Sequence, residues 1–134
     1  MTVNDLDKSY FDFHLNLLNT FIDQLKQQPP FCIENIDFDD QSFLLELTQL
    51  PKVGGSGLLI QGQQLFCRIV AGYPHLMPLV PRDLLWFFGG DCLHYMPDEE
   101  ISVFQQLDEL RENAKESNEV FSYEKARLST MGLH

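Results

Sequence analysis

Basic residues are scarce in this chain. Its 134 residues include nine Lys and Arg against 20 Asp and Glu, which gives a formal net charge of −11 at pH 7. Nucleic-acid binders need clustered cations that displace the counterions around phosphate, and proteins that bind anionic membranes need similar clusters. No cluster of Lys or Arg here exceeds an isolated pair. The composition therefore disfavours direct binding to nucleic acid or to a membrane surface. The negative charge favours cations, either metal ions or a basic protein partner, and solubility alone is the alternative explanation.

Cysteines are few, and long hydrophobic runs are lacking. Cys32, Cys67 and Cys92 are an odd number without close pairing, so the sequence does not indicate a disulfide framework. No apolar run approaches the roughly 20 residues that a membrane-spanning helix requires. The N-terminal residues also lack the basic and apolar regions of a secretory signal. We therefore expect a cytoplasmic protein with free thiols.

Apolar residues are plentiful enough to build a core. They make up 44% of the chain and include 11 Phe, close to the globular average of about 45–50%. The length fits a single domain, since domains commonly hold about 100 to 150 residues. We expect one domain over residues 1–120 and a weakly structured tail over residues 121–134, where the periodic pattern fades.

Helical patterns stand near both ends of the domain. Apolar residues recur every three or four positions from about residue 4 to residue 28, and Pro29-Pro30 ends this pattern. A short helix is expected at residues 83–88, before Gly89-Gly90. A longer helix is expected to begin at Pro97, because acidic residues fill its first turn and oppose the helix dipole.

The middle of the chain has the pattern of short strands. Phe43, Leu45 and Leu47 alternate as they would on one face of a strand, and Gly62 lies where a hairpin turn would need a positive φ. We therefore expect an α+β fold with an N-terminal helix, a four-stranded antiparallel meander and two C-terminal helices packed on the sheet. The expected strands are residues 31–37, 43–48, 58–60 and 65–70.

The segment 89–100 is the richest in reactive side chains. Asp91, Cys92 and His94 are candidate ligands for a metal ion such as zinc, and His75 is a candidate fourth ligand. The signal is weak, because the paired Cys and His spacings of structural zinc sites do not occur. No other cofactor is predicted.

Cys92 has two further interpretations. It could act as a nucleophile near the start of a helix, with His75 or His14 as its base. It could equally be structural, since a single Cys in a cytosolic protein is most often a small buried apolar residue. No residue is assigned a catalytic role.

Two kinds of side chain are candidates for contact with a protein partner. The three aromatic residues at 86–88 cannot all face one core on a helix, because neighbours point about 100° apart. Aromatic side chains are favoured anchors at interfaces, and the last helix carries many carboxylates. The candidate partner-binding residues are Trp86, Tyr95, Asp98, Glu99, Asp108 and Glu112.

These observations favour a non-enzymatic, acidic protein-binding module: an adaptor, an inhibitor or a dedicated chaperone. Its partner is expected to be a protein of basic character, and homodimerisation is a further option. Two alternatives remain open. One is a metal-binding or Cys-dependent enzyme centred on residues 91–94, and the other is a nucleic-acid mimic that uses the acidic C-terminal helix.

Overall fold

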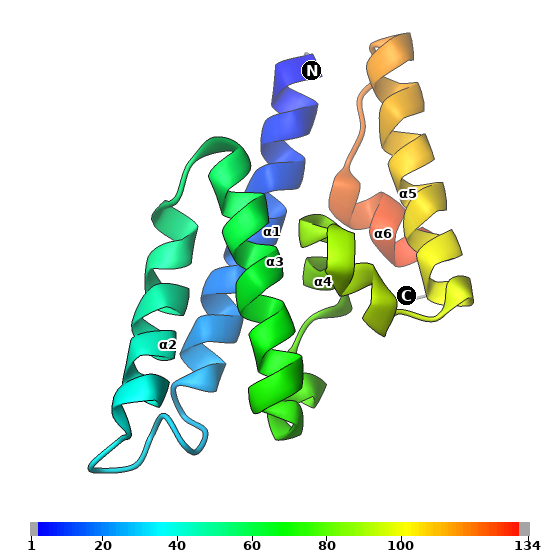
Figure 1. The fold of residues 1–134 in the computed structure, drawn as a ribbon. Helices are drawn as coiled ribbons and strands as arrows, with labels where there is room; N and C mark the ends of the chain where they lie inside the picture. The colour runs from blue at the N-terminus through cyan, green and yellow to red at the C-terminus, as the bar shows by residue number, and fades with distance from the viewer. Residues whose placement is uncertain (1–2, 132–134) are drawn as a thin grey trace. The chain divides into compact units, whose positions relative to one another are not determined.

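The computed structural model describes residues 3–131, and the regular secondary structure in this part of the chain is all helical, with no strand (Figure 1). The expected α+β fold with a four-stranded meander is therefore wrong. The elements are α1 (Val3–Leu25), α2 (Phe38–Gln49), η1 (Leu50–Lys52), α3 (Gly55–Gly72), η2 (Pro74–Leu79), α4 (Arg82–Phe88), η3 (Gly90–Tyr95), α5 (Asp98–Ser117) and α6 (Tyr123–Thr130), where η marks a short 3-10 helix.

The residues expected to form the second strand instead form α2. Phe43 and Leu47 are fully buried, whereas Leu45 between them is 62% exposed. This spacing of four is that of a helix with one buried face. Asp39 and Asp40 lie in the first turn of α2, where carboxylates oppose the positive end of the helix dipole. The alternation of apolar letters at 43, 45 and 47 was therefore misleading.

The third and fourth expected strands belong to one helix, α3. Its buried residues lie three or four positions apart on one face: Leu58, Gly62, Leu65, Phe66 and Ile69. Gly62 does not form a hairpin turn. A Cβ added at Gly62 would overlap the ring of Phe88, so this glycine allows α4 to pack closely against α3. The first expected strand, residues 31–37, is a series of turns after α1.

The helices expected near both ends of the domain are present as α1, α4 and α5. Gly89 ends α4 with a φ of 68°, a conformation that favours glycine. The tail was expected to be weakly structured, yet residues Tyr123–Thr130 form α6. The Ser122 side chain caps this helix by accepting a hydrogen bond from the Lys125 backbone N–H. Residues 132–134 of the expected tail lie outside the described residues.

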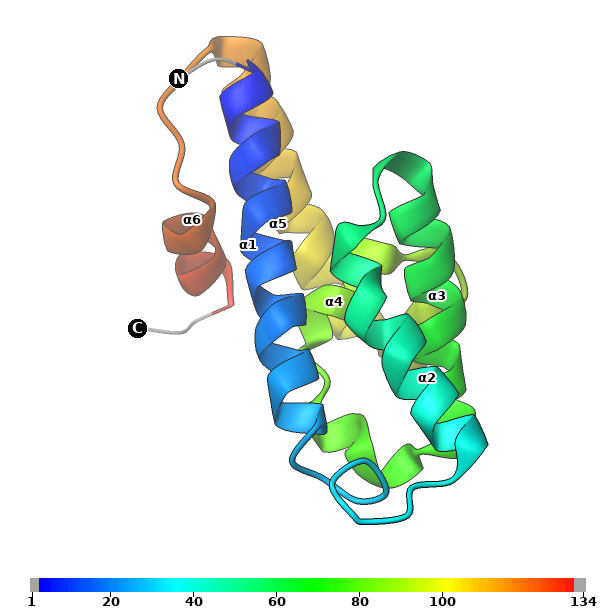
Figure 2. The same ribbon diagram turned by 90° about the vertical axis from the view of Figure 1, so that its left-hand side faces the viewer.

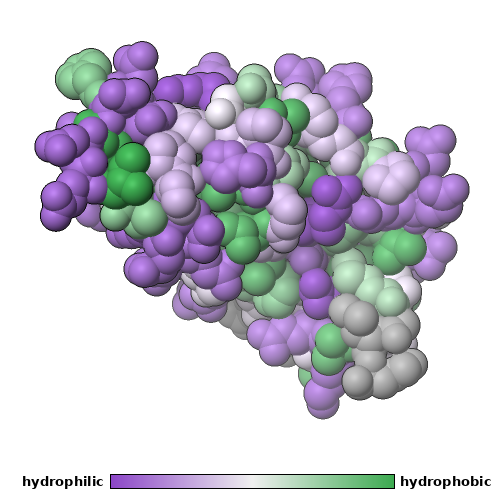
Figure 3. Space-filling model, turned by 90° about the horizontal axis from the view of Figure 1, so that it is seen from below, coloured by the Kyte–Doolittle hydropathy of each residue, from purple (hydrophilic) through white to green (hydrophobic). Residues whose placement is uncertain are grey.

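The described residues divide into two compact units. The first unit comprises residues 3–13 and 96–131, and the second comprises residues 14–95. No helix within residues 3–131 combines the length and apolar character that a membrane span requires. On the face seen in Figure 3, hydrophobic residues form small patches separated by hydrophilic ones.

The second unit has an aromatic core. The rings of Phe31, Phe43 and Tyr73 form a cluster, in which the Tyr73 centroid lies 5.0 Å from the centroid of each Phe ring. Phe66 lies 4.9 Å from Phe88 and so joins α3 to α4. Burying such a ring stabilises the fold by about 1.5–3 kcal/mol. Each helix of this unit therefore commits one face to the core.

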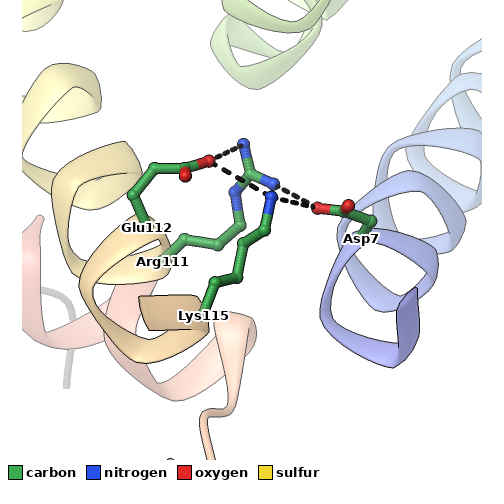
Figure 4. Close-up of polar contacts among 4 residues, drawn as sticks. All are labelled: Asp7, Arg111, Glu112 and Lys115. Atoms are coloured by element: carbon green, nitrogen blue, oxygen red, sulfur yellow. Dashed lines mark hydrogen bonds and ion pairs between the residues drawn. The ribbon is translucent and has the colours of Figure 1, made fainter. Parts of the chain in front are cut away.

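The first unit is held by aromatic and ionic contacts among α1, α5 and α6. The Tyr123 ring packs edge-on against Tyr10, with centroids 5.1 Å apart. Asp7 Oδ1 accepts from Arg111 Nη1 at 3.0 Å and lies 3.1 Å from Lys115 Nζ (Figure 4). The Arg111 guanidinium also lies over the Tyr10 ring, 4.0 Å from its centroid. These contacts join the start of α1 to the second half of α5.

Candidate functional site

Helices α2 and α3 form a hairpin joined by η1 and lie side by side in Figures 1 and 2. Leu50 anchors the turn because it is fully buried. The Val53 N–H closes the turn by donating to the Leu50 carbonyl oxygen at 3.0 Å. Since both helices bury one face in the core, their opposite faces form a surface of their own.

A groove of about 620 Å³ runs along this surface. Most of its lining residues are exposed, and they combine apolar side chains, amides and one ion pair. We call it the α2–α3 groove; its lining residues are Leu45, Glu46, Gln49, Gln61, Gln64, Leu65 and Arg68. Its volume is in the range of sites that receive a ligand or a partner's side chains.

Two further hollows adjoin the groove at Arg68. One, of about 410 Å³, is lined by Asp39, Asp40, Arg68, Ala71, Gly72 and Tyr73. The other, of about 530 Å³, is lined by Ile60, Gln63, Gln64, Cys67, Arg68 and Asp91. Because Arg68 lines all three spaces, they form one continuous surface on the second unit.

Arg68 is held in place by two contacts. Its Nη1 donates to Glu46 Oε2 at 2.6 Å, and its guanidinium lies 4.9 Å from the centroid of the Phe43 ring. The two side chains of the ion pair are about half exposed, at 49% and 57%. An exposed pair of this kind contributes only about 0–1 kcal/mol to stability. Its main effect is therefore to orient the guanidinium, which retains an accessible surface.

Carboxylates dominate the charge around Arg68. Within the described part of the chain, the residues that line the three spaces include four carboxylates and one cation: Asp39, Asp40, Glu46, Asp91 and Arg68. The Tyr73 hydroxyl donates to Asp40 Oδ1 at 2.5 Å. Burial and the neighbouring Asp40 raise the pKa of Tyr73 well above its usual value, so the hydroxyl stays protonated. The surface is therefore negative near neutral pH.

The four predicted metal ligands are not brought together. Asp91 Oδ1 and His94 Nε2 are 3.9 Å apart on η3, and both side chains are about 80% exposed. His75 lies elsewhere, with its Nε2 2.9 Å from the Pro29 carbonyl oxygen. Over residues 3–131, no three His, Cys, Asp or Glu side chains are grouped as a metal ion would require.

Cys92 has the environment of a structural residue. It is fully buried, and its Sγ is 4.0 Å from the Gln63 carbonyl oxygen, to which it donates. Burial, with smaller effects of Cys67 and Asp91, raises the pKa of the Cys92 thiol to about 12. The thiol is therefore protonated at neutral pH and lacks the thiolate that nucleophilic catalysis needs. His14, a candidate base, stacks on Phe87 at 4.6 Å within the core.

The predicted partner-binding residues fall in both units. Trp86 is half-buried, and Tyr95 is 37% exposed; both belong to the second unit. Asp98 and Glu99 are exposed in the first turn of α5.

Asp108 and Glu112 lie further along α5. Asp108 is half-buried, so it does not belong to an open acidic face. Glu112 Oε1 lies 3.4 Å from Lys115 Nζ and 4.0 Å from Arg111 Nη2. Figure 4 shows these two ion pairs. The carboxylates of α5 are thus interrupted by cations, unlike an uninterrupted array of phosphate-like charges.

The α2–α3 groove was not among the sites expected from the sequence. The sequence did indicate an exposed apolar surface, because on a helix Leu45 lies on the opposite side from Phe43 and Leu47. Phe38 lies seven residues before Leu45, on the same side of α2, and is 80% exposed. Reading residues 38–49 as a helix would have left these two apolar side chains without a core to enter.

Comparison with known proteins places the chain in a family. The comparisons with curated proteins and with solved structures gave no match. The sequence model of the PA2817-like family matches residues 6–133, which is nearly the whole chain and includes both units. The chain therefore belongs to the PA2817-like family.

Proposed function

We propose that this chain is a non-enzymatic protein-binding module, such as an adaptor, an inhibitor or a dedicated chaperone, and that it binds its partner in the α2–α3 groove. The observation that carries the proposal is the pair of exposed apolar side chains beside Arg68. Leu45, which lines the groove, is 62% exposed on α2. Ile60, which lines the adjoining hollow that shares Gln64 and Arg68 with the groove, is 55% exposed on α3. Both lie on a hairpin whose opposite face is fully committed to the core.

A protein partner would gain from covering this surface. Removing apolar area from water is favourable by about 25 cal/mol per Å², so covering two exposed aliphatic side chains would favour association. Arg68 adds a half-exposed guanidinium already oriented by Glu46 and Phe43. Arginine is enriched among the residues that dominate binding energy at protein interfaces. The amides of Gln49, Gln61 and Gln64 supply donors and acceptors around these anchors.

The alternatives have less support from the geometry. A Cys-dependent enzyme would need a thiolate at Cys92, whose pKa is raised to about 12 by burial. A nucleic-acid mimic would need an open run of carboxylates on α5, whereas Lys115 and Arg111 are close to Glu112. The proposal includes a cytoplasmic location, since the three cysteines are free and Cys32 is exposed.

Site-specific photo-crosslinking in cells tests this function. A photoreactive phenylalanine analogue replaces Gln64 at the groove, and in a control protein it replaces Glu116, which is exposed on α5. We expect discrete protein adducts from position 64 that disappear when Leu45→Ser and Ile60→Ser are added. Adducts that persist in the double variant, or that form only from position 116, would contradict the proposal.

A further inference from the structure

Building on the proposed function, we infer that the α2–α3 groove binds a basic amphipathic helix of a partner protein. The inference rests on the exposed apolar side chains of the groove and of the hollow beside it, together with the excess of carboxylates around them. It names the class of partner, which the proposed function leaves open.

The apolar part of the groove fits one face of a helix. A helix that lies between two others offers apolar anchors at positions i, i+3 or i+4, and i+7. Leu45 on α2 lines the groove as an exposed residue, and Leu65 on α3 lines it as a buried one. Ile60 on α3 is also exposed and lines the adjoining hollow, which shares Gln64 and Arg68 with the groove. Such a partner satisfies its own backbone hydrogen bonds, so the groove needs to supply only side-chain contacts.

The charged residues around the groove determine which sign of charge the partner must carry. Glu46 is 57% exposed and Asp91 is 83% exposed, and Asp39 is exposed at the start of α2. Among the described lining residues, Arg68 is the one cation that faces these carboxylates and Asp40. Lys or Arg residues flanking the apolar stripe of a partner would find complementary charges here, whereas an acidic helix would be repelled.

The same charges argue against a second copy of this chain as the occupant. In a two-fold dimer each copy contributes the same surface, so a residue near the axis faces its own equivalent. A dimer through this surface would therefore bring together two surfaces that each carry four carboxylates and one cation among their lining residues. A basic helix from another protein removes this repulsion.

The inference is tested with a fluorescein-labelled synthetic helix of about 16 residues that carries Leu along one face and Lys elsewhere. Its binding to the full chain is measured by fluorescence anisotropy. A matched peptide has Glu in place of every Lys. We expect the Lys peptide to bind at least about tenfold more tightly than the Glu peptide, and to weaken as NaCl rises from about 50 to about 300 mM.

Four variants separate the groove from the net charge of the chain. Leu45→Ser with Ile60→Ser should weaken the binding of the Lys peptide about tenfold. Leu110→Ser with Val120→Ser alters exposed apolar residues in the first unit and should leave that binding unchanged. Asp39→Asn with Asp91→Asn should weaken it severalfold. Glu116→Gln with Glu119→Gln changes the net charge equally on exposed first-unit residues and should leave the affinity unchanged.

Other outcomes would overturn the inference in distinguishable ways. Equal losses of affinity from the two pairs of charge-changing substitutions would show that the Lys peptide is attracted by the net charge of the chain and not by the groove. Equal binding of both peptides, lost with Leu45→Ser and Ile60→Ser, would leave the groove as a protein-binding site but exclude a basic partner. A dimer that dissociates on Leu45→Ser in size-exclusion chromatography would make a second copy the occupant. Failure of both peptides to bind would exclude the helix, while the crosslinking experiment would still decide the proposed function.

Discussion

Replacing Gly62 by Ala should destabilise the second unit, although alanine usually favours a helix. In α3 the substitution alone would contribute about 1 kcal/mol of helix propensity. The new Cβ would, however, overlap the ring of Phe88, which is 2% exposed and packs against Phe66. Overpacking a filled core costs about 1–3 kcal/mol, so the clash should dominate. Because the added Cβ would overlap several carbons of the ring, the cost should lie in the upper part of this range, at about 2–3 kcal/mol. After the gain in helix propensity is subtracted, we expect the free energy of unfolding to fall by about 1–2 kcal/mol.

The measurement is urea denaturation followed by circular dichroism, with Gly72→Ala as the matched control. Gly72 ends the same helix, and a Cβ there would meet no atom within 4 Å. The control should change stability by less than about 0.5 kcal/mol. Phe88→Leu should reduce the cost of Gly62→Ala in a double-mutant cycle, because the smaller side chain removes the clashing ring. Equal stability of Gly62→Ala and Gly72→Ala, or no coupling to Phe88, would refute the packing of α3 against α4.

Three further predictions concern groups with unusual surroundings. Because burial raises the pKa of Cys92 to about 12, the native thiol should resist labelling at pH 8. The free energy of unfolding should fall as the pH rises above the ordinary thiol pKa of about 8.5, because only the unfolded chain then loses the proton. Cys92→Ala should remove this part of the pH dependence. Tyr73→Phe should cost about 1 kcal/mol in denaturant titrations, because Asp40 loses its hydroxyl donor. Asp7→Asn should lower the thermal midpoint more at low salt than at high salt, because the ion pair with Arg111 is partly exposed; an equal loss at both salt concentrations would contradict an electrostatic origin.

The long helices could be predicted from the sequence, and the short ones in the middle could not. In α1 and α5 the apolar period extends over 23 and 20 residues, so chance alternation has little influence. In α2, of 12 residues, Leu45 completes an apparent alternation with Phe43 and Leu47, although it points away from the core. Apolar patterns predict secondary structure only when the apolar residues are buried in the core, and Leu45 is exposed at the surface.

Gly62 shows a second limit of sequence reasoning. A glycine between apolar segments usually marks a turn, and its helical role depends on Phe88, which lies 26 positions later. No local pattern reports that contact. Because Gly62 was expected in a hairpin turn, helix α3 was not predicted, and neither was the candidate site around Arg68.

The environment of Cys92 could be anticipated only as one of several options. Its sequence neighbours Asp91 and His94 suggested chemistry, whereas the structure turns both of those side chains toward solvent and buries the thiol. Adjacent residues in a 3-10 helix point in different directions, so closeness in sequence does not create a site. The structural interpretation of Cys92 agrees with its burial.

Photo-crosslinking from position 64 decides whether the α2–α3 groove binds a protein. We expect a discrete adduct that is present in the otherwise native chain and absent when Leu45→Ser and Ile60→Ser are added. An adduct of unchanged yield in the double variant would show that the exposed apolar pair does not hold the partner, and would contradict the claim.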